Sequence, residues 1–83
     1  MADMKVGELT HYYNKIGVGV IHVLGTIKVG DRIKISGHDH EFEQEVTSMQ
    51  IEHKSINSAK KGDDVGMKID QPAKEGDEVY KVE

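Results

Sequence analysis

The sequence contains no cysteine and no tryptophan, one proline, and only one phenylalanine and three tyrosines. Without cysteine the chain has no disulfide and no thiolate ligand for zinc, which is compatible with a reducing compartment. No apolar run is long enough to cross a bilayer, and residues 1–4 carry no signal-peptide pattern. We therefore expect a cytoplasmic location and no membrane partner.

The length and charge of the chain narrow the classes of partner. With 83 residues the chain is expected to form one domain over residues 1–83. Its formal net charge of −4 argues against a general nucleic-acid binder, which needs excess lysine and arginine. The charge is unevenly distributed, however. Residues 53–61 contain three lysines and no acid, whereas three glutamates of residues 41–45 alternate along one predicted strand face.

Glycine followed by aspartate occurs three times, each time before an alternating apolar run. The pairs are Gly30-Asp31, Gly62-Asp63 and Gly76-Asp77. Gly25 and Gly30 have the spacing of a phosphate-binding loop, but Asp31 stands where that loop needs a lysine, and a strand pattern follows. We therefore interpret the pairs as turns that lead into strands, and we expect no nucleotide binding.

Strand patterns fill the chain, and helix patterns are nearly absent. Alternating or β-branched runs predict six strands, at residues 6–13, 17–24, 32–36, 42–53, 65–69 and 79–82. Short strands joined by turns, without crossover helices, predict an all-β protein, an antiparallel sandwich or barrel. We favour a six-stranded antiparallel closed β-barrel, because closure would remove the exposed strand edges that a chain this small cannot otherwise cover.

The strand predicted at residues 42–53 changes phase along its length. Phe42 and Val46 point to one face, whereas Met49 and Ile51 occupy odd positions and point to the other. A bulge near Thr47 would return all four side chains to the core, so one bulged strand with these residues buried is predicted.

Four blocks of the sequence resemble the second domain of translational GTPases such as elongation factor Tu. They are GTIKVGDRIKISG at residues 25–37, VTSMQIE at 46–52, AKKGDDVGMKI at 59–69 and EGDEVYKV at 75–82. The resemblance covers nearly the whole chain and implies a free-standing, elongation factor-like barrel of the translation-protein kind. The GTPase domain itself is missing. The run Asn14-Lys15-Ile16-Gly17 imitates a guanine-reading motif but ends in glycine instead of aspartate, so no GTP binding is expected.

In that family the barrel helps to hold the aminoacylated end of transfer RNA. The resemblance places Gln50, His53, Asp64 and Lys68 at the pocket positions, although none of them is the residue that the family usually has. The adjacent Lys54, Lys60 and Lys61 complete the predicted partner or RNA-binding surface.

Other chemistry has little support in the sequence. His38 and His40 would place two imidazoles on one face of an extended segment, a spacing suited to zinc or nickel, but no third ligand is evident. His22 is interpreted as a strand residue rather than a ligand. No serine has the nucleophile-elbow pattern, and no pair of carboxylates stands out. We therefore predict a protein that is not an enzyme, with no catalytic residue, cofactor or metal.

Two functions remain open. The first is a binding module that docks on transfer RNA, ribosomal RNA, the ribosome or a translation-related protein. The second is an accessory interaction subunit of a larger enzyme, because similar barrels occur as C-terminal domains of collagenase-like peptidases that act in RNA modification or proteolysis. The sequence indicates neither the partner nor the oligomeric state.

Overall fold

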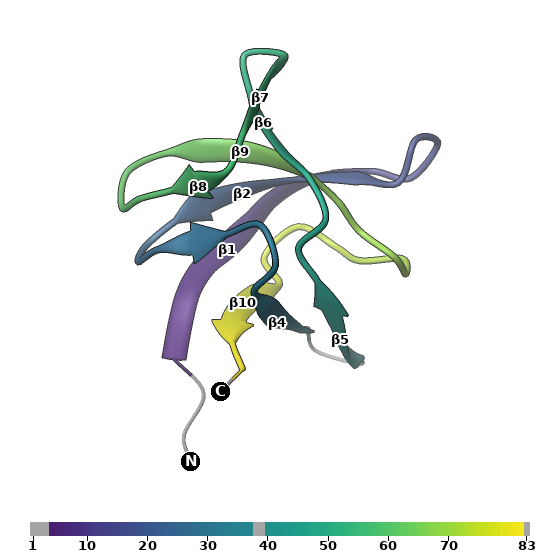
Figure 1. The fold of residues 1–83 in the computed structure, drawn as a ribbon. Coiled ribbons are helices and arrows are strands. Elements are labelled where there is room, and N and C mark those ends of the chain that lie inside the picture. The colour runs from purple at the N-terminus through teal and green to yellow at the C-terminus, as the bar shows by residue number, and fades with distance from the viewer. Residues whose placement is uncertain (1–3, 38–39, 83) are drawn as a thin grey trace.

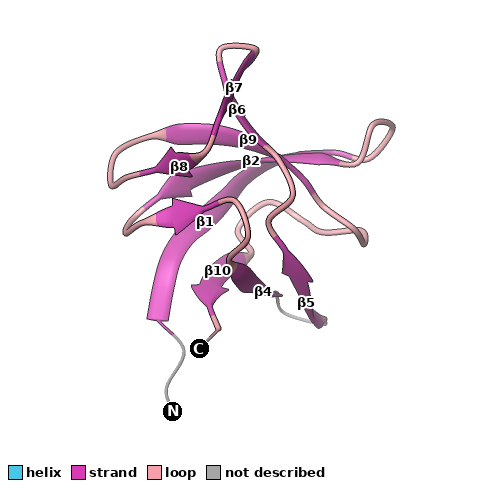
Figure 2. Cartoon of the chain, viewed as in Figure 1, coloured by secondary structure: helices cyan, strands magenta, loops and turns pink. Residues whose placement is uncertain are grey.

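The computed structural model describes residues 4–37 and 40–82. These residues form strands, turns and loops (Figure 2). The strands are β1 (Met4–Tyr13), β2 (Val18–Val23), β3 (Ile27–Lys28), β4 (Arg32–Ser36), β5 (Glu41–Glu45), β6 (Met49–Ile51), β7 (Lys54–Ile56), β8 (Ser58–Ala59), β9 (Asp64–Lys68) and β10 (Glu78–Lys81). No helix of the described chain is long and apolar enough to span a membrane.

Eight of the strands form one antiparallel sheet in the order β5-β4-β10-β1-β2-β9-β6-β7, and β3 pairs with β8. The large sheet is strongly curled, so that β4, β5 and β10 lie below β9, β6 and β7 in Figure 1. The long strand β1 runs between the two halves, pairing with β10 along its first part and with β2 along its second. The prediction of an all-β antiparallel fold is confirmed.

The predicted closure into a six-stranded barrel is wrong. The hydrogen-bonded order ends at β5 on one side and at β7 on the other, so the sheet is a curled half-barrel. The chain leaves β5 at residue 45 and resumes strand structure only at Met49, where β6 pairs with β9 rather than continuing β5. The predicted strand 42–53 is thus two strands that lie far apart in the sheet order.

The break between β5 and β6 falls where the bulge was predicted. Phe42, Val46 and Met49 are buried as expected, and Ile51 is half-buried and packs against the core. The phase change in the sequence was therefore detected correctly. What differs is its structural form, because a three-residue connection restores the inward direction of the side chains without a continuous ladder.

One side chain links the two halves of the curled sheet. Gln44 on β5 is only 3% exposed, and its Nε2 donates to the carbonyl oxygen of Lys68 at 2.7 Å. The backbone N–H of Asp70 donates to its Oε1 at 2.8 Å. The amide thus satisfies one backbone group on either side of Ile69, as a neighbouring strand would, and it replaces a ladder across this seam.

The core lies inside the curl and is built from the inward residues of both halves. Its fully buried larger members are Val6, Leu9, Ile21, Val23, Ile27, Ile33, Ile35, Val46, Met49, Val65, Met67 and Val79. Packing is tight around Gly19, where an added Cβ would lie 2.5 Å from Leu9 and 3.0 Å from Ile69. A side chain at position 19 would therefore collide with the core.

Three turns share one construction, Lys-x-Gly-Asp. The turn at Lys60 is typical: the N–H of Asp63 donates to the Lys60 carbonyl at 3.0 Å, and the Asp63 carboxylate accepts from the Lys60 N–H at 3.1 Å. The turns that begin at Lys28 and Lys74 have the same pair of bonds. Their glycines have φ between 93° and 97°, a backbone conformation that glycine adopts without strain. The predicted glycine-aspartate turns are confirmed.

We expect Gly62→Ala to destabilise the protein by about 1–2 kcal/mol, because alanine is strained at this positive φ although space for its Cβ is open. Gly66→Ala is the matched control, since its Cβ would meet no atom closer than 3.7 Å and no positive φ is involved. Urea unfolding of both variants checks the expectation. Equal stabilities of the two variants would contradict the strain argument.

We expect Gln44→Met to destabilise the fold by about 2–4 kcal/mol, because it leaves a carbonyl and an N–H without partners at the seam. The matched substitution Gln50→Met changes an exposed glutamine and should move stability by less than about 0.5 kcal/mol. Both values follow from chemical denaturation. A Gln44→Met protein as stable as the wild type would show that the seam does not need this amide.

Candidate functional site

One hollow on the described surface lies between two hairpins. One hairpin joins β1 to β2, and the other joins β6 to β7; both extend from the sheet in Figure 1. Residues of both hairpins and of β9 line a space of about 460 Å³. We call this space the inter-hairpin groove.

The floor of the inter-hairpin groove is a row of neighbours on three strands. Val20 on β2 pairs with Gly66 on β9, and Gly66 pairs with Gln50 on β6. Because residues paired across a sheet point to the same face, Gly66 leaves a gap between the side chains of Val20 and Gln50. The hollow is thus built by the absence of one side chain in the middle of a row.

The β1–β2 hairpin supplies an apolar wall. Tyr13 is 48% exposed, and Ile16 is 69% exposed, the highest value among the large hydrophobic residues described. Val18 stands beside Tyr13 in the ladder and also faces the hollow. Apolar side chains that gather on a concave surface are the usual lining of a binding site.

The β6–β7 hairpin supplies a charged wall through an unusual turn. Glu52 has φ 52° and His53 has φ 67°, so both residues of the two-residue loop are left-handed. Two positive φ values define a type I′ turn, which favours Asn-Gly because other residues are strained there. The strain is accepted at a place where both side chains line the groove.

Asp64 adds a second carboxylate at the same end of the groove. Its Oδ1 lies 2.8 Å from Nδ1 of His22, its neighbour in the β2–β9 ladder. The bond orients Asp64, whose side chain remains 66% exposed. His22 is thus a strand residue that orients Asp64.

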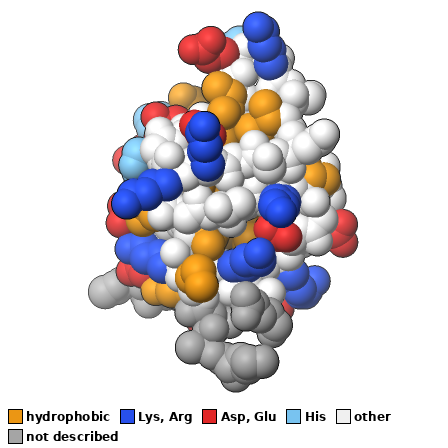
Figure 3. Space-filling model, turned by 60° about the vertical axis from the view of Figure 1, so that its left-hand side comes forward, with side chains coloured by type: hydrophobic (Ala, Val, Ile, Leu, Met, Phe, Trp, Pro, Cys, Tyr) orange, Lys and Arg blue, Asp and Glu red, His pale blue; other side chains and the backbone are white. Residues whose placement is uncertain are grey.

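The structure brings together only part of the predicted partner surface. Gln50, His53 and Asp64 line the inter-hairpin groove, whereas Lys68 lines a neighbouring hollow of about 110 Å³. The three remaining lysines, Lys54, Lys60 and Lys61, line neither hollow. Lysine and arginine side chains are spread over the face in Figure 3 with acidic side chains between them. That face does not present one basic patch.

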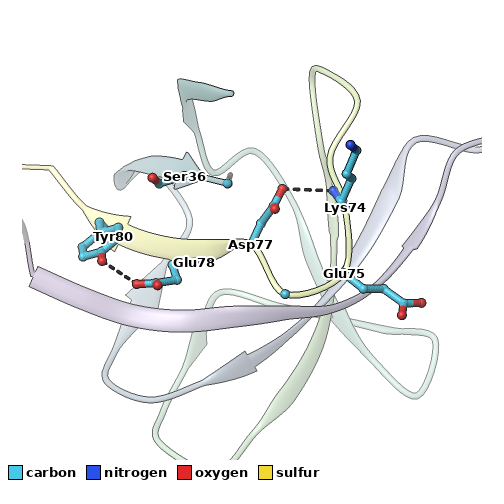
Figure 4. A pocket seen from close by; sticks show the side chains of 8 residues that line it. Ser36, Lys74, Glu75, Asp77, Glu78 and Tyr80 are labelled. Carbon is cyan, nitrogen blue, oxygen red and sulfur yellow. Dashed lines mark hydrogen bonds between the residues drawn. The ribbon is translucent and has the colours of Figure 1, made fainter. Parts of the chain in front are cut away.

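A second pocket of about 330 Å³ lies beside the turn that begins at Lys74 (Figure 4). Asp77 is the buried carboxylate there, at 4% exposure, and its Oδ2 accepts from the Lys74 N–H at 3.0 Å. The same oxygen lies 2.7 Å from Nε2 of His40. Gly37 packs against both groups, because an added Cβ would lie 2.5 Å from the Asp77 carboxylate. These contacts fix a turn to the β4–β5 connection.

The metal hypothesis for His38 and His40 has no support in the described residues. His38 lies outside them, and His40 is engaged with Asp77. No group of three or more metal-ligating side chains occurs within residues 4–37 and 40–82.

A hydroxyl, a carboxylate and an ammonium group interact at the edge of this pocket. The Tyr80 hydroxyl donates to the Glu78 carboxylate, which also lies 3.6 Å from Nζ of Lys5. The bond from Tyr80, followed by the charge of Lys5, lowers the pKa of Glu78 below its usual value. The same bond raises the pKa of Tyr80. A bond with Glu8 chiefly raises the pKa of Lys5.

Comparison with known proteins places this geometry in context. No model of a known protein family matches the sequence. An uncharacterized protease from Methanocaldococcus jannaschii is 40% identical over 78 residues, which make up 93% of this chain and 19% of that protein. The chain thus spans about a fifth of the length of this curated relative.

Solved structures match the whole fold. The C-terminal domain of a putative U32 peptidase from Geobacillus thermoleovorans superposes with a TM-score of 0.91 at 17% identity, covering 96% of this chain and 93% of that domain. Its selenomethionine variant gives 0.87 at 16% identity, covering 92% of this chain and 96% of that one. The fold is that of this C-terminal domain.

These findings correct the resemblance to translational GTPases. The relatives are a protease and the C-terminal domain of a putative U32 peptidase, so the prediction of an elongation factor-like protein is wrong. Three of the four sequence blocks that carried the resemblance contain a glycine-aspartate turn of this chain. Shared turn sequences indicate a similar local backbone structure, but they do not indicate a shared function.

Sequence reasoning missed the apolar half of the groove. Val18 and Gly66 were assigned to strands, and Ile16 to the connection between two strands, without a functional role. One signal was present, because Gly66 is a glycine inside a predicted strand, between Val65 and Met67. The β6–β7 turn had no such signal, since Glu52-His53 is not a typical hairpin turn sequence.

We expect Tyr80→Phe to raise the pKa of Glu78 toward its usual value, because the hydroxyl stabilises the ionised carboxylate. Carboxyl ¹³C NMR over a pH titration measures the shift. Tyr13→Phe is the control, since Tyr13 has no contact with Glu78 among those described. An unchanged titration of Glu78 in Tyr80→Phe would contradict the assigned cause.

Proposed function

We propose that this chain acts as a non-catalytic accessory domain of a U32-peptidase-type protein. The observation that carries the proposal is the domain-for-domain superposition on the C-terminal domain of a putative U32 peptidase, over 96% of this chain and 93% of that domain. The 40% identity to a segment of a much longer protease supports the same role. The remainder of such a protein would carry the catalytic groups.

The use of polar groups in the described residues supports an accessory role. The buried carboxylate of Asp77 contacts the Lys74 N–H and His40. The buried amide of Gln44 bonds to backbone groups of Lys68 and Asp70. A catalytic acid or base must lie within hydrogen-bonding reach of the substrate. These two buried groups serve the fold, whereas the inter-hairpin groove keeps its polar groups exposed for a partner.

The proposal predicts binding in trans. We expect this chain to associate with the M. jannaschii protease after removal of the segment that matches it, with a Kd of about 1–100 µM, as is typical of moderate domain interfaces. Isothermal titration calorimetry measures the affinity, and size-exclusion chromatography gives the stoichiometry.

The full-length M. jannaschii protease is the matched control. Its own segment occupies the proposed place, so it should bind this chain at least about tenfold more weakly than the shortened protein. Circular dichroism establishes that both partners are folded. If the folded, shortened protease does not bind this chain, or if the shortened and full-length proteases bind it equally, the proposed accessory role is wrong.

A further inference from the structure

We propose that the inter-hairpin groove binds an extended polypeptide. The ligand places a bulky apolar side chain over Gly66 and a lysine or arginine, two residues away, beside Glu52 and Asp64. This inference rests on the proposed function, because a domain that accompanies a peptidase meets polypeptide chains.

Gly66 is the first observation, because the fold does not require a glycine there. At Gly7 and Gly37 an added Cβ would lie within 2.7 Å of another atom, so packing explains those glycines. At Gly66 the nearest atom is 3.7 Å away, and no positive φ is recorded. A glycine in the middle of a strand weakens the strand. Its use here leaves an open hollow on the outer face.

The apolar wall provides the anchor site. Tyr13 and Ile16 are exposed on one side of the hollow, and Val18 and Val20 continue the wall toward the sheet. A volume of about 460 Å³ lies within the range of about 300–1,000 Å³ that ligand sites occupy. A leucine or phenylalanine side chain placed over Gly66 would cover these exposed surfaces.

The spacing of the carboxylates fits an extended ligand. Asp64 lies two residues from Gly66 on β9, and Glu52 lies two residues from Gln50, in the turn that follows β6 and in the same direction along the sheet. Alternate residues of an extended chain point to one side and repeat every 6.4–6.8 Å or so. A ligand that follows the strands therefore brings its next like-facing side chain to the two carboxylates.

Two hydrogen-bonding groups that line the groove are unused. Within the described residues, the Gln50 amide and the Tyr13 hydroxyl make no hydrogen bond, although both line the groove. An amide that offers both a donor and an acceptor suits the backbone of an extended peptide.

The charge at this end of the groove selects the class of ligand. Glu52 and Asp64 would repel the phosphates of a nucleic acid, whose binding depends on lysine and arginine contacts. They attract a basic side chain instead. The strained turn holds Glu52 at the groove where Asn-Gly would be more stable, which agrees with a binding role for the side chain.

The test uses the chain alone and three end-blocked peptides, followed by amide NMR titration. The probe is Gly-Phe-Gly-Arg-Gly, with Gly-Phe-Gly-Glu-Gly as the charge control and Gly-Gly-Gly-Arg-Gly as the anchor control. We expect the probe to bind with a Kd of about 0.1–1 mM. Its shifts should centre on Val18, Gln50, Asp64 and Gly66, and each control should bind at least about threefold more weakly.

Two variants test the groove while preserving the fold. Gly66→Val fills the hollow with a good strand former and should weaken the probe about tenfold or more. The double change Glu52→Asn with His53→Gly keeps a type I′ turn, removes the carboxylate and should weaken the probe about threefold. Glu45→Gln, which removes one negative charge from β5, is the matched control and should leave binding unchanged.

Each outcome separates this inference from the proposed function. Equal binding of the acidic peptide, shifts outside the groove, or full affinity in Gly66→Val would overturn the inference. Tighter binding of pentauridylate than of the probe at the same residues would also overturn it, in favour of RNA. In any of these cases, association of this chain with the shortened protease would still support the accessory role. If the chain does not associate with that protease, the accessory role is rejected on its own evidence.

Discussion

The curled sheet depends on the buried amide of Gln44. Backbone ladders end at β5 and β7, so the two halves of the sheet need another link across the seam. The amide satisfies a carbonyl at Lys68 and an N–H at Asp70, which flank the buried Ile69. A buried polar group stabilises a fold only when its partners are complete, and no buried side-chain polar atom of the described residues lacks a partner. The Gln44 amide and the separate β3–β8 pair thus link the two halves without barrel closure.

The repeated Lys-x-Gly-Asp turns determine where strands can begin. Each turn combines a glycine at positive φ with an aspartate that bonds back to the first residue, and each ends directly before a strand or leads into one. The turn that ends at Asp63 starts β9, which carries the floor of the inter-hairpin groove. The turn that ends at Asp77 is also fixed by His40. The same local device therefore positions the inter-hairpin groove and the pocket beside the turn that begins at Lys74.

Local chemistry made most of the fold predictable, and long-range pairing made the rest unpredictable. Arg32–Ser36 was predicted with its observed bounds, because alternation and a glycine-aspartate turn are local signals. The break after β5 was not predicted, because a bulge within one strand and a connection between two strands produce the same phase change in the sequence. At the site, Gln50, His53 and Asp64 came from a resemblance that proved wrong, although the structure places all three in one groove. The apolar wall depends on how two hairpins approach each other, which no local pattern specifies.

The inter-hairpin groove is where local rules are broken without a reason in the packing. A strand glycine has room for a side chain at Gly66, the type I′ turn carries Glu52 and His53, and Ile16 is largely exposed. Each departure costs stability, whereas Gly7, Gly19 and Gly37 are explained by close neighbours. Natural sequences depart from local consistency mainly at functional or strained sites. Because three unrelated departures meet at one surface, binding explains them together, whereas folding explains none of them.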